Sequence, residues 1–180
     1  GRMQKTMEKI SVLYSQEEVE NRIQEIADEI NRDYAGKEIR VIGILRGGVY
    51  FMTELSKRIT VPVTIDFLAA SSYGDGTTSK GKVNITKDLD EDIAGQEVLV
   101  VEDIIDSGRT LSCLYDMLMA RGPKSLTLCT LLDKPDRRVP ESTAVVKYTG
   151  FVIPDKFVVG YGLDYAQRYR NLPYIGVVEL

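Results

Sequence analysis

Several residues with catalytic potential follow one apolar run, residues 98–101. Two adjacent carboxylates, Glu102 and Asp103, come directly after the run, Asp106 follows, and residues 107–110 (Ser-Gly-Arg-Thr) open a helical pattern. The N–H groups at a helix start bind anions, and paired carboxylates bind hydroxyl groups or a metal ion. A phosphorylated sugar offers both a phosphate and hydroxyl groups. The alternative is a plain strand–turn–helix with a Ser or Asp N-cap.

Alternating strands and helices must position these residues. Four longer strands are predicted at residues 39–45, 63–70, 98–101 and 125–132. Shorter strands are expected near residues 144–148, 157–161 and 174–178. A helix begins at Ser15, because Glu18 completes a capping box with it, and two more helices start near residues 49 and 109. This alternation predicts one α/β domain, residues 3–180, with a central, mainly parallel sheet.

Ligands of parallel sheets bind beside the carboxyl ends of the strands. This rule adds Leu45, Arg46 and Gly47, after the first strand, and Lys134, after the fourth. A tight glycine turn and a solvated loop lysine are the structural alternatives for these residues. The stretch 71–82 is rich in Gly, Ser and Thr and lacks periodicity, so it predicts a long mobile loop of the kind that forms lids.

The composition excludes several classes of enzyme. The 180 residues include no His, and 27 acidic residues against 23 basic ones give a formal net charge of −4. A Ser-His-Asp triad, a Cys-His pair and a His-Glu-x-x-His zinc site are therefore impossible. Proton transfer must use a carboxylate, Tyr, Lys, Cys or water. The acidic balance disfavours a non-specific nucleic-acid binder.

The sequence also indicates a compartment. The N-terminus lacks the apolar segment of a signal peptide, and no apolar run approaches the ~20 residues that span a membrane. Cys113 and Cys129 form no Cys-x-x-Cys pair, and we expect one on a helix and one on a strand as buried thiols. Gly1 and Arg2, ahead of Met3, resemble a cloning remnant. These features favour a cytoplasmic protein that binds no membrane.

The segment VVEDIIDSGRT, residues 100–110, resembles the phosphoribosyl-pyrophosphate motif of the type I phosphoribosyltransferases. Four further segments narrow the resemblance: LRGG at 45–48, SSYG at 71–74, LLDKP at 131–135 and IPDKFVVGYGLDYAQRYRNLPYIG at 153–176. From about residue 10 onward the chain resembles the hypoxanthine (or hypoxanthine-guanine) branch of that family. The resemblance implies the type I fold, with a small hood of N- and C-terminal segments over the base.

The resemblance also implies a reaction in purine salvage. A 6-oxopurine and phosphoribosyl pyrophosphate would give IMP or GMP and pyrophosphate, with Mg²⁺ as cofactor. Glu102 and Asp103 would hold the ribose hydroxyls and the metal, and Asp106 would accept the purine N7 proton or stabilise the developing charge. The 5′-phosphate would be bound by Asp106, Ser107, Gly108, Arg109 and Thr110, chiefly through backbone amides. The Arg109 side chain is expected to face solvent and has no assigned role.

The resemblance also implies which residues bind the pyrophosphate and which residues form a lid. Leu45, Arg46 and Gly47 would bind pyrophosphate, with a cis peptide bond before Arg46, and Arg170 would reach the same group. Ser72 and Tyr73 would begin a lid, about residues 71–82, that closes over the reacting centre.

The base would be recognised by four residues. Lys134 suits a purine O6 and matches a 6-amino group poorly, so the implied bases are hypoxanthine and guanine. Phe157 would stack on the purine, with the Val158 backbone at the base edge. Asp164 would bind a second Mg²⁺ near the purine 2-position.

Two alternatives stay open. One is a regulator that senses phosphoribosyl pyrophosphate and uses the same fold to bind nucleic acid, which the acidic balance disfavours. The other is a transferase for another base, above all xanthine, since xanthine differs from guanine only at the 2-position. The resemblance further implies a homodimer or a homotetramer.

Overall fold

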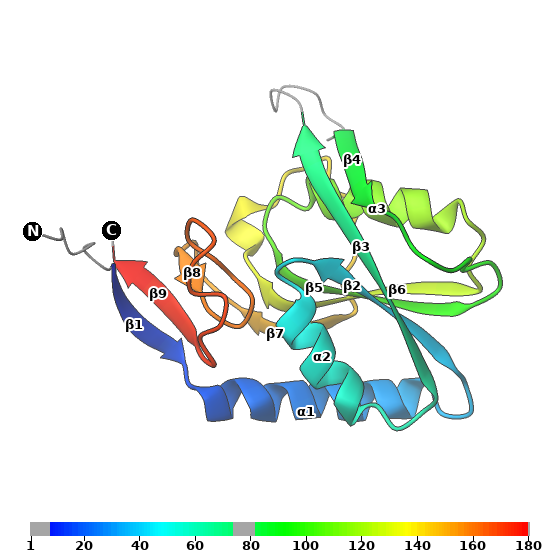
Figure 1. Cartoon of the computed structure of the whole chain (residues 1–180), viewed down its shortest axis with the longest axis horizontal. Coiled ribbons are helices and arrows are strands. Elements are labelled where there is room, and N and C mark those ends of the chain that lie inside the picture. Colours follow the sequence, from blue (N-terminus) through cyan, green and yellow to red (C-terminus); the bar gives the residue numbers. More distant parts are fainter. Residues whose placement is uncertain (1–7, 74–81, 180) are drawn as a thin grey trace, which may run out of the picture.

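The central element of the structure is a six-stranded sheet (Figure 1). The computed structural model describes residues 8–73 and 82–179. The strands are, in spatial order, β4 (Lys82–Lys87), β3 (Val63–Tyr73), β2 (Ile39–Leu45), β5 (Glu97–Ile105), β6 (Ser125–Asp133) and β7 (Tyr148–Val152). All neighbouring strands are parallel except β3 and β4. The predicted central, mainly parallel sheet is therefore confirmed.

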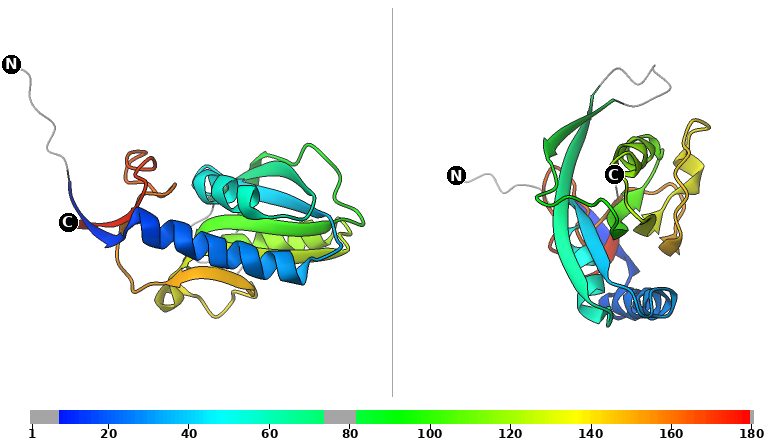
Figure 2. Two further views of the ribbon diagram at one scale, coloured as in Figure 1. Left: turned by 90° about the horizontal axis from the view of Figure 1, so that it is seen from below. Right: turned by 90° about the vertical axis from the view of Figure 1, so that its right-hand side faces the viewer.

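Helices cover both faces of this sheet. The helices are α1 (Gln16–Asp33), α2 (Val49–Arg58), α3 (Arg109–Met119) and a single 3₁₀ turn, η1 (Pro135–Arg137). Helices α1 and α2 lie on one face and α3 on the other (Figure 2). In β5, Leu99 and Val101 join the core under α1 and α2, whereas Val98 and Val100 join the core under α3. Because strand side chains alternate between faces, an unbroken apolar run makes a strand that is buried on both sides.

Helix α1 begins where the sequence predicts. The Ser15 hydroxyl accepts a hydrogen bond from the Glu18 amide at 3.2 Å, and the Glu18 carboxylate accepts one from the Ser15 amide at 3.1 Å. The predicted capping box is confirmed, and it satisfies two N–H groups that a helix start leaves unpaired.

A second, three-stranded antiparallel sheet brings the two ends of the described chain together. It consists of β1 (Lys9–Tyr14), β9 (Ile175–Glu179) and β8 (Val158–Val159), in that order. β7 leads into β8 through residues 153–157, so this sheet lies beside the carboxyl end of β7 (Figure 1). N- and C-terminal segments thus build one small layer, although no strand is predicted for β1.

The bounds of β5 and β7 differ from the prediction. The strand expected near residues 144–148 is β7, at residues 148–152, and residues 144–147 are irregular. Ala144 and Val146 pack against the core under α3, which explains their apolar spacing. Strand β5 continues to Ile105, so Glu102 and Asp103 lie within the strand and not at its end. Apolar spacing reports burial, and buried residues need not be paired in a sheet.

The stretch 71–82, expected to be a loop, is strand at both of its ends. Residues 71–73 end β3 and pair with residues 82–84 of β4 in an antiparallel ribbon. The loop prediction is therefore wrong for residues 71–73 and 82. The rest of the predicted lid, residues 74–81, lies outside the described residues, as do Gly1 and Arg2.

The cysteines occupy the expected kinds of element. Cys113 lies on α3 and Cys129 on β6, and both are free thiols. Cys129 is buried as expected, but the expected burial is wrong for Cys113, which is half-buried. Burial raises the pKa of the Cys129 thiol, so it stays protonated at neutral pH. Within residues 8–73 and 82–179, no helix has the length and apolar composition required to cross a bilayer.

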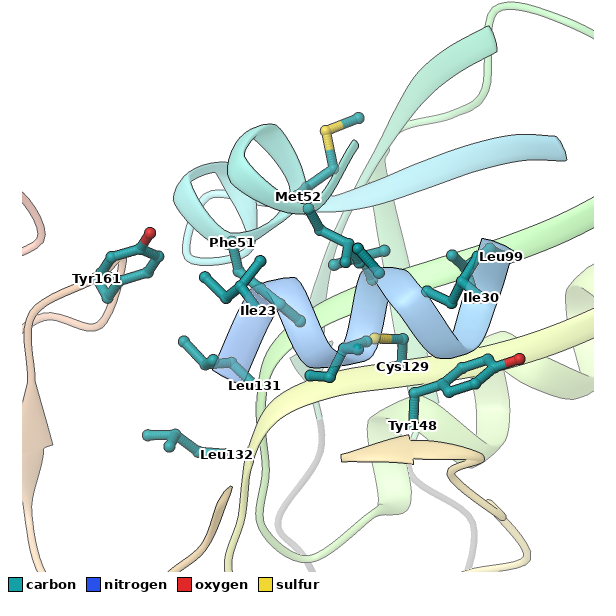
Figure 3. Packing of buried hydrophobic residues seen from close by; sticks show 14 of the residues in the cluster. Ile23, Ile30, Phe51, Met52, Leu99, Cys129, Leu131, Leu132, Tyr148 and Tyr161 are labelled. Carbon is teal, nitrogen blue, oxygen red and sulfur yellow. The ribbon is translucent and has the colours of Figure 1, made fainter. Parts of the chain in front are cut away.

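The packing of the core under α1 and α2 leads to the first testable prediction. Phe51 on α2 is fully buried among side chains of α1, β5 and β6, some of which Figure 3 shows. Phe51→Ala is expected to lower the free energy of unfolding by about 3–5 kcal/mol, because it leaves a cavity that the packed core fills only partly. Denaturant titration measures this loss. Thr53→Ala, at an exposed position of the same helix, is expected to change it by about 0.5 kcal/mol or less, and equal losses would contradict this packing.

Candidate active site

The carboxylates of Glu102 and Asp103 lie near the carboxyl end of β5. The Asp103 amide donates to Glu102 Oε1 at 3.2 Å, and the Ile104 amide donates to Asp103 Oδ1 at 2.7 Å. Burial and the neighbouring Asp103 charge raise the pKa of Glu102 well above its usual value, and burial also raises the pKa of Asp103. Two desolvated acids side by side favour a cation or hydroxyl groups as a ligand, because either relieves their repulsion.

The segment from the last residue of β5 to the first two residues of α3, residues 105–110, is named the Asp106 turn here. It includes Gly108, whose φ of +81° is a left-handed conformation suited to glycine, and α3 begins at the next residue. A pocket of about 250 Å³ lies against this turn, lined among others by Glu102, Asp106, Ser107, Gly108 and Thr110. The exposed Asp106 side chain and the N–H groups of a helix start share this pocket, so it offers both an acid and an anion site.

The turn after β2 lies directly against Asp103. The Leu45–Arg46 peptide bond is cis, as the resemblance implies. A Cβ added to Gly47 would stand 1.9 Å from Asp103 Oδ2, so only glycine leaves room for the carboxylate. The ends of two adjacent parallel strands thereby form one continuous surface.

Residues 160–170 complete this surface from the other side. A Cβ on Gly162, which has a φ of +99°, would stand 1.9 Å from the Gly47 carbonyl oxygen. The Arg170 guanidinium donates to the Gly162 carbonyl at 2.7 Å and lies 3.6 Å from Asp164. Its positive charge also lowers the pKa of Asp103, although burial outweighs this effect. Predicted residues from three separate segments therefore converge around Gly47.

A residue that the sequence did not single out links the two predicted pyrophosphate arginines. Gln167 Oε1 accepts hydrogen bonds from Arg46 Nη1 at 3.1 Å and from Arg170 Nη2 at 3.2 Å. The backbone N–H of Gln167 donates to Asp164 Oδ2 at 2.9 Å. The neutral amide oxygen holds the two guanidinium groups near each other without cancelling their charge, and only Arg170 also has a carboxylate, Asp164, at 3.6 Å among the described residues.

Lys134 lies at the carboxyl end of β6. Its side chain is almost fully buried, and Nζ lies 4.0 Å from Asp155 Oδ1. Its backbone amide donates to the Ile105 carbonyl at 3.0 Å, which joins it to the Asp106 turn. The solvated-loop alternative for Lys134 is wrong, because this burial holds the ammonium group in a defined place.

The predicted base-stacking residue lies in the small sheet layer. Phe157 is 42% exposed and meets the Tyr165 ring edge-on, with centroids 5.5 Å apart. Val158 belongs to β8, which pairs with β9 on one side and is the edge strand of the three-stranded sheet. An exposed aromatic ring and an edge strand with a free side can both serve a planar ligand.

The remaining predicted site residues are Ser72 and Tyr73, in the β3–β4 ribbon, and Arg109, on α3. Ser72 is exposed and pairs with Val83 in the β3–β4 ribbon, and Tyr73 is the last residue of β3. Arg109, the first residue of α3, is half-buried, and its Nε atom is buried without a hydrogen-bond partner among the described residues.

The carboxylates fit a magnesium ion that a substrate helps to hold. Among the described residues, no group of three or more His, Cys, Asp or Glu side chains forms a metal cage. Mg²⁺ sites commonly need only one or two carboxylates, because water and substrate phosphates supply the other ligands. The desolvated pair Glu102 and Asp103 meets this requirement, and Asp164 is a separate single carboxylate.

Comparisons with known proteins agree with this geometry. A family model described as a phosphoribosyl transferase domain matches residues 10–166. A hypoxanthine phosphoribosyltransferase from Salmonella typhimurium is 52% identical over 173 residues, which cover 95% of this chain and 96% of that protein. A bifunctional protein TilS/HprT from Listeria monocytogenes is also 52% identical, over 168 residues, and this chain spans 26% of it.

A solved structure extends the likeness to three dimensions. The crystal structure of a hypoxanthine-guanine phosphoribosyltransferase from Bacillus anthracis, with a HEPES molecule in its active site, has a TM-score of 0.91 and 48% identity. The match covers 96% of this chain and 100% of that one. The chain therefore belongs to the phosphoribosyltransferase family and, within it, to the hypoxanthine phosphoribosyltransferases.

Proposed function

We propose that this protein transfers the 5-phosphoribosyl group from phosphoribosyl pyrophosphate to a 6-oxopurine, hypoxanthine or guanine, in purine salvage. The products are IMP or GMP and pyrophosphate. The observation that carries the proposal is the pocket at the Asp106 turn, which is lined by Glu102, by the exposed Asp106 and by the start of α3. The family and the names of the similar proteins support it.

The phosphates are held by two separate groups in this proposal. The backbone amides and hydroxyls of the Asp106 turn bind the 5′-phosphate. Arg46 and Arg170, joined through Gln167, bind the pyrophosphate together with the backbone of Leu45 and Gly47. Glu102 and Asp103 would hold the ribose hydroxyls and Mg²⁺, and Asp164 would hold a second Mg²⁺. When bound, Mg²⁺ would supply positive charge that offsets the charge of the phosphates.

The reaction develops positive charge on the ribose, as in other glycosyl transfers. Asp106 lies at the pocket edge, where its carboxylate stabilises that charge or accepts the proton of purine N7. Lys134 donates to the purine O6, Phe157 stacks on the ring, and the backbone of the edge strand at Val158 contacts the base. Residues 71–82, including Ser72 and Tyr73, act as a lid that excludes water from the activated ribose.

A substrate panel tests the proposed function. Hypoxanthine, guanine, xanthine and adenine are each incubated with phosphoribosyl pyrophosphate and Mg²⁺, and the nucleotides are separated by chromatography. IMP and GMP are expected to form much faster than AMP. Product from xanthine alone would reassign the base, and no product from any base would remove the enzyme function.

Lys134→Met tests base recognition. The change is expected to lower kcat/KM for hypoxanthine by about 10- to 100-fold, the effect of one charge-assisted hydrogen bond, because methionine fills the buried space but donates nothing. The Kd for phosphoribosyl pyrophosphate should stay unchanged, since Lys134 contacts only the base in this proposal. Lys147→Met, on the surface beside Asp33, serves as control. A loss confined to phosphoribosyl pyrophosphate binding would place Lys134 elsewhere in the mechanism.

We further propose that residues 3–180 form a single domain, that the protein is cytoplasmic, and that it assembles as a homodimer or homotetramer. The two hydrophobic cores lie on opposite faces of one sheet and share its strands, which supports the single domain. Sedimentation of the purified protein distinguishes a dimer from a tetramer.

A further inference from the structure

Three successive carbonyl oxygens of the Asp106 turn accept hydrogen bonds from one short segment, residues 134–139. The acceptors are Ile105, Asp106 and Ser107; the donors, in the same order, are the Lys134 amide at 3.0 Å, Arg138 Nε at 3.1 Å and the Val139 amide at 3.1 Å. In a planar trans peptide, the carbonyl and the following N–H point in opposite directions. Binding the carbonyls on one side therefore turns the N–H groups of residues 106–108 toward the other side, where a phosphate would bind.

Arg138 contributes the only side chain among these three donors. Its Nη2 donates to the Asp133 carboxylate at the end of β6, while its Nε reaches the Asp106 carbonyl. Asp133 and Ile105 are paired residues of adjacent strands, so the guanidinium bridges two strand ends. The Arg138 side chain is 26% exposed and the Asp133 side chain 19%, which shields the ion pair from much of the solvent. The planar guanidinium suits this double contact.

Residues 142–144, which lie shortly after this segment, hold the start of α3. The buried Ser112 hydroxyl accepts hydrogen bonds from the Thr143 and Ala144 amides at 3.0 and 3.1 Å and lies 3.2 Å from the Ser142 hydroxyl. A Cβ on Gly108 would stand 2.2 Å from Ser142 Oγ and 2.9 Å from Arg138 Cδ. Residues 138–144 thus contact both the Asp106 turn and the start of α3.

We propose that Arg138 is a positioning residue of the reaction, a role that rests on the function proposed above. By binding the Asp106 carbonyl, it sets the peptide planes of the turn so that the amides face the 5′-phosphate and the Asp106 carboxylate faces the base. Arg138 touches no substrate in this account. Its effect reaches the reaction only through the turn that it holds.

Arg138→Met tests this role. The variant is expected to raise the Kd for IMP, which carries the 5′-phosphate, and to lower kcat, each by about 10- to 100-fold, the effect of one charge-assisted hydrogen bond. The KM for hypoxanthine, which lacks a phosphate, is expected to stay unchanged. Asp133→Asn should give a smaller effect of the same kind, and the double variant should lose less than the sum of the two.

Arg121→Met is the matched control. Arg121 donates two hydrogen bonds to Asp88, at 2.8 and 3.0 Å, and its side chain is 31% exposed, but the pair lies outside the site. This variant loses a comparable ion pair and is expected to keep the wild-type Kd for IMP and kcat.

Two outcomes overturn the proposal. One is an Arg138→Met protein with wild-type IMP affinity and kcat. The other is a loss that falls equally on IMP and hypoxanthine, since that indicates only a general loss of structure. If Arg138→Met folds poorly, Arg138→Lys is measured instead. Lysine keeps a positive charge near Asp133 but lacks the second nitrogen that would donate to the Asp106 carbonyl. An unchanged IMP affinity of Arg138→Lys also overturns the proposal. Failure of the wild-type protein to make IMP is a different result, which removes the proposed function itself.

Discussion

Replacement of Asp106 by asparagine is expected to lower kcat for IMP synthesis by about 10²- to 10⁴-fold, the range for loss of a general acid or base. The KM values for both substrates should change far less. Asparagine has nearly the same shape and keeps an acceptor oxygen, but it carries no charge and accepts no proton at neutral pH. With no His in the chain, no imidazole can take over that task.

The structure makes this test selective. The Asp106 backbone is held through its carbonyl by Arg138, so changing the side chain leaves the turn in place. The exposed side chain avoids any large cost in stability. Asp116→Asn, an exposed acid on α3, is the control for lost charge. Steady-state kinetics with unchanged turnover would remove Asp106 from the chemistry, whereas a rise in KM alone would assign it to substrate binding.

The layers of the fold could be predicted because local residues decide them. Strand β2 has the predicted bounds, since its apolar run ends at the polar Arg46, and the start of α1 follows from Ser15 and Glu18 alone. These signals are short-range: they depend on periodicity and on hydrogen bonds within one turn of helix.

Elements that depend on distant partners could not be predicted in the same way. Strand β1 pairs Lys9 with Glu179, and only this pairing makes a strand of a short segment that lies mostly on the surface. The ribbon that replaces part of the predicted loop likewise depends on the pairing of residues 71–73 with 82–84. Strand pairing brings its own stabilisation, so composition alone misjudges such segments.

In the proposed site, too, some residues could be predicted from local motifs and others depend on distant partners. Motif residues such as Asp103 and Arg170 could be named from the sequence, and the structure places them close enough for the Arg170 charge to affect the pKa of Asp103. Gln167 and Arg138 could not be named from the sequence. A polar residue in a loop looks the same in a sequence whether its side chain is solvated or hydrogen-bonded to another residue. Only the hydrogen bonds to Arg46 and to the Asp106 carbonyl distinguish them.

Replacement of Gly47 is expected to have the second large effect on activity, because three parts of the site meet at this residue. Its Cα faces the Asp103 carboxylate, its carbonyl faces Gly162, and the Leu45–Arg46 peptide precedes it. A Cβ at 1.9 Å from Asp103 Oδ2 is far inside the 3.4 Å at which ordinary contact begins, so either the carboxylate or the turn must move by more than an ångström. Both are groups that the proposed function assigns to the metal and the pyrophosphate.

Gly47→Ala is therefore expected to lower kcat/KM for phosphoribosyl pyrophosphate by about 10²-fold or more, since a displacement of about 1 Å in a reacting site costs that much. Gly162→Ala should act in the same direction, because its Cβ would push on the Gly47 carbonyl from the opposite side. Gly95→Ala is the control: its φ of +74° brings backbone strain, but nothing lies within 4 Å of the new Cβ, so it should lower stability and leave kcat/KM unchanged. If Gly47→Ala behaves as Gly95→Ala does, the contact between Gly47 and Asp103 plays no part in holding the pyrophosphate and the metal.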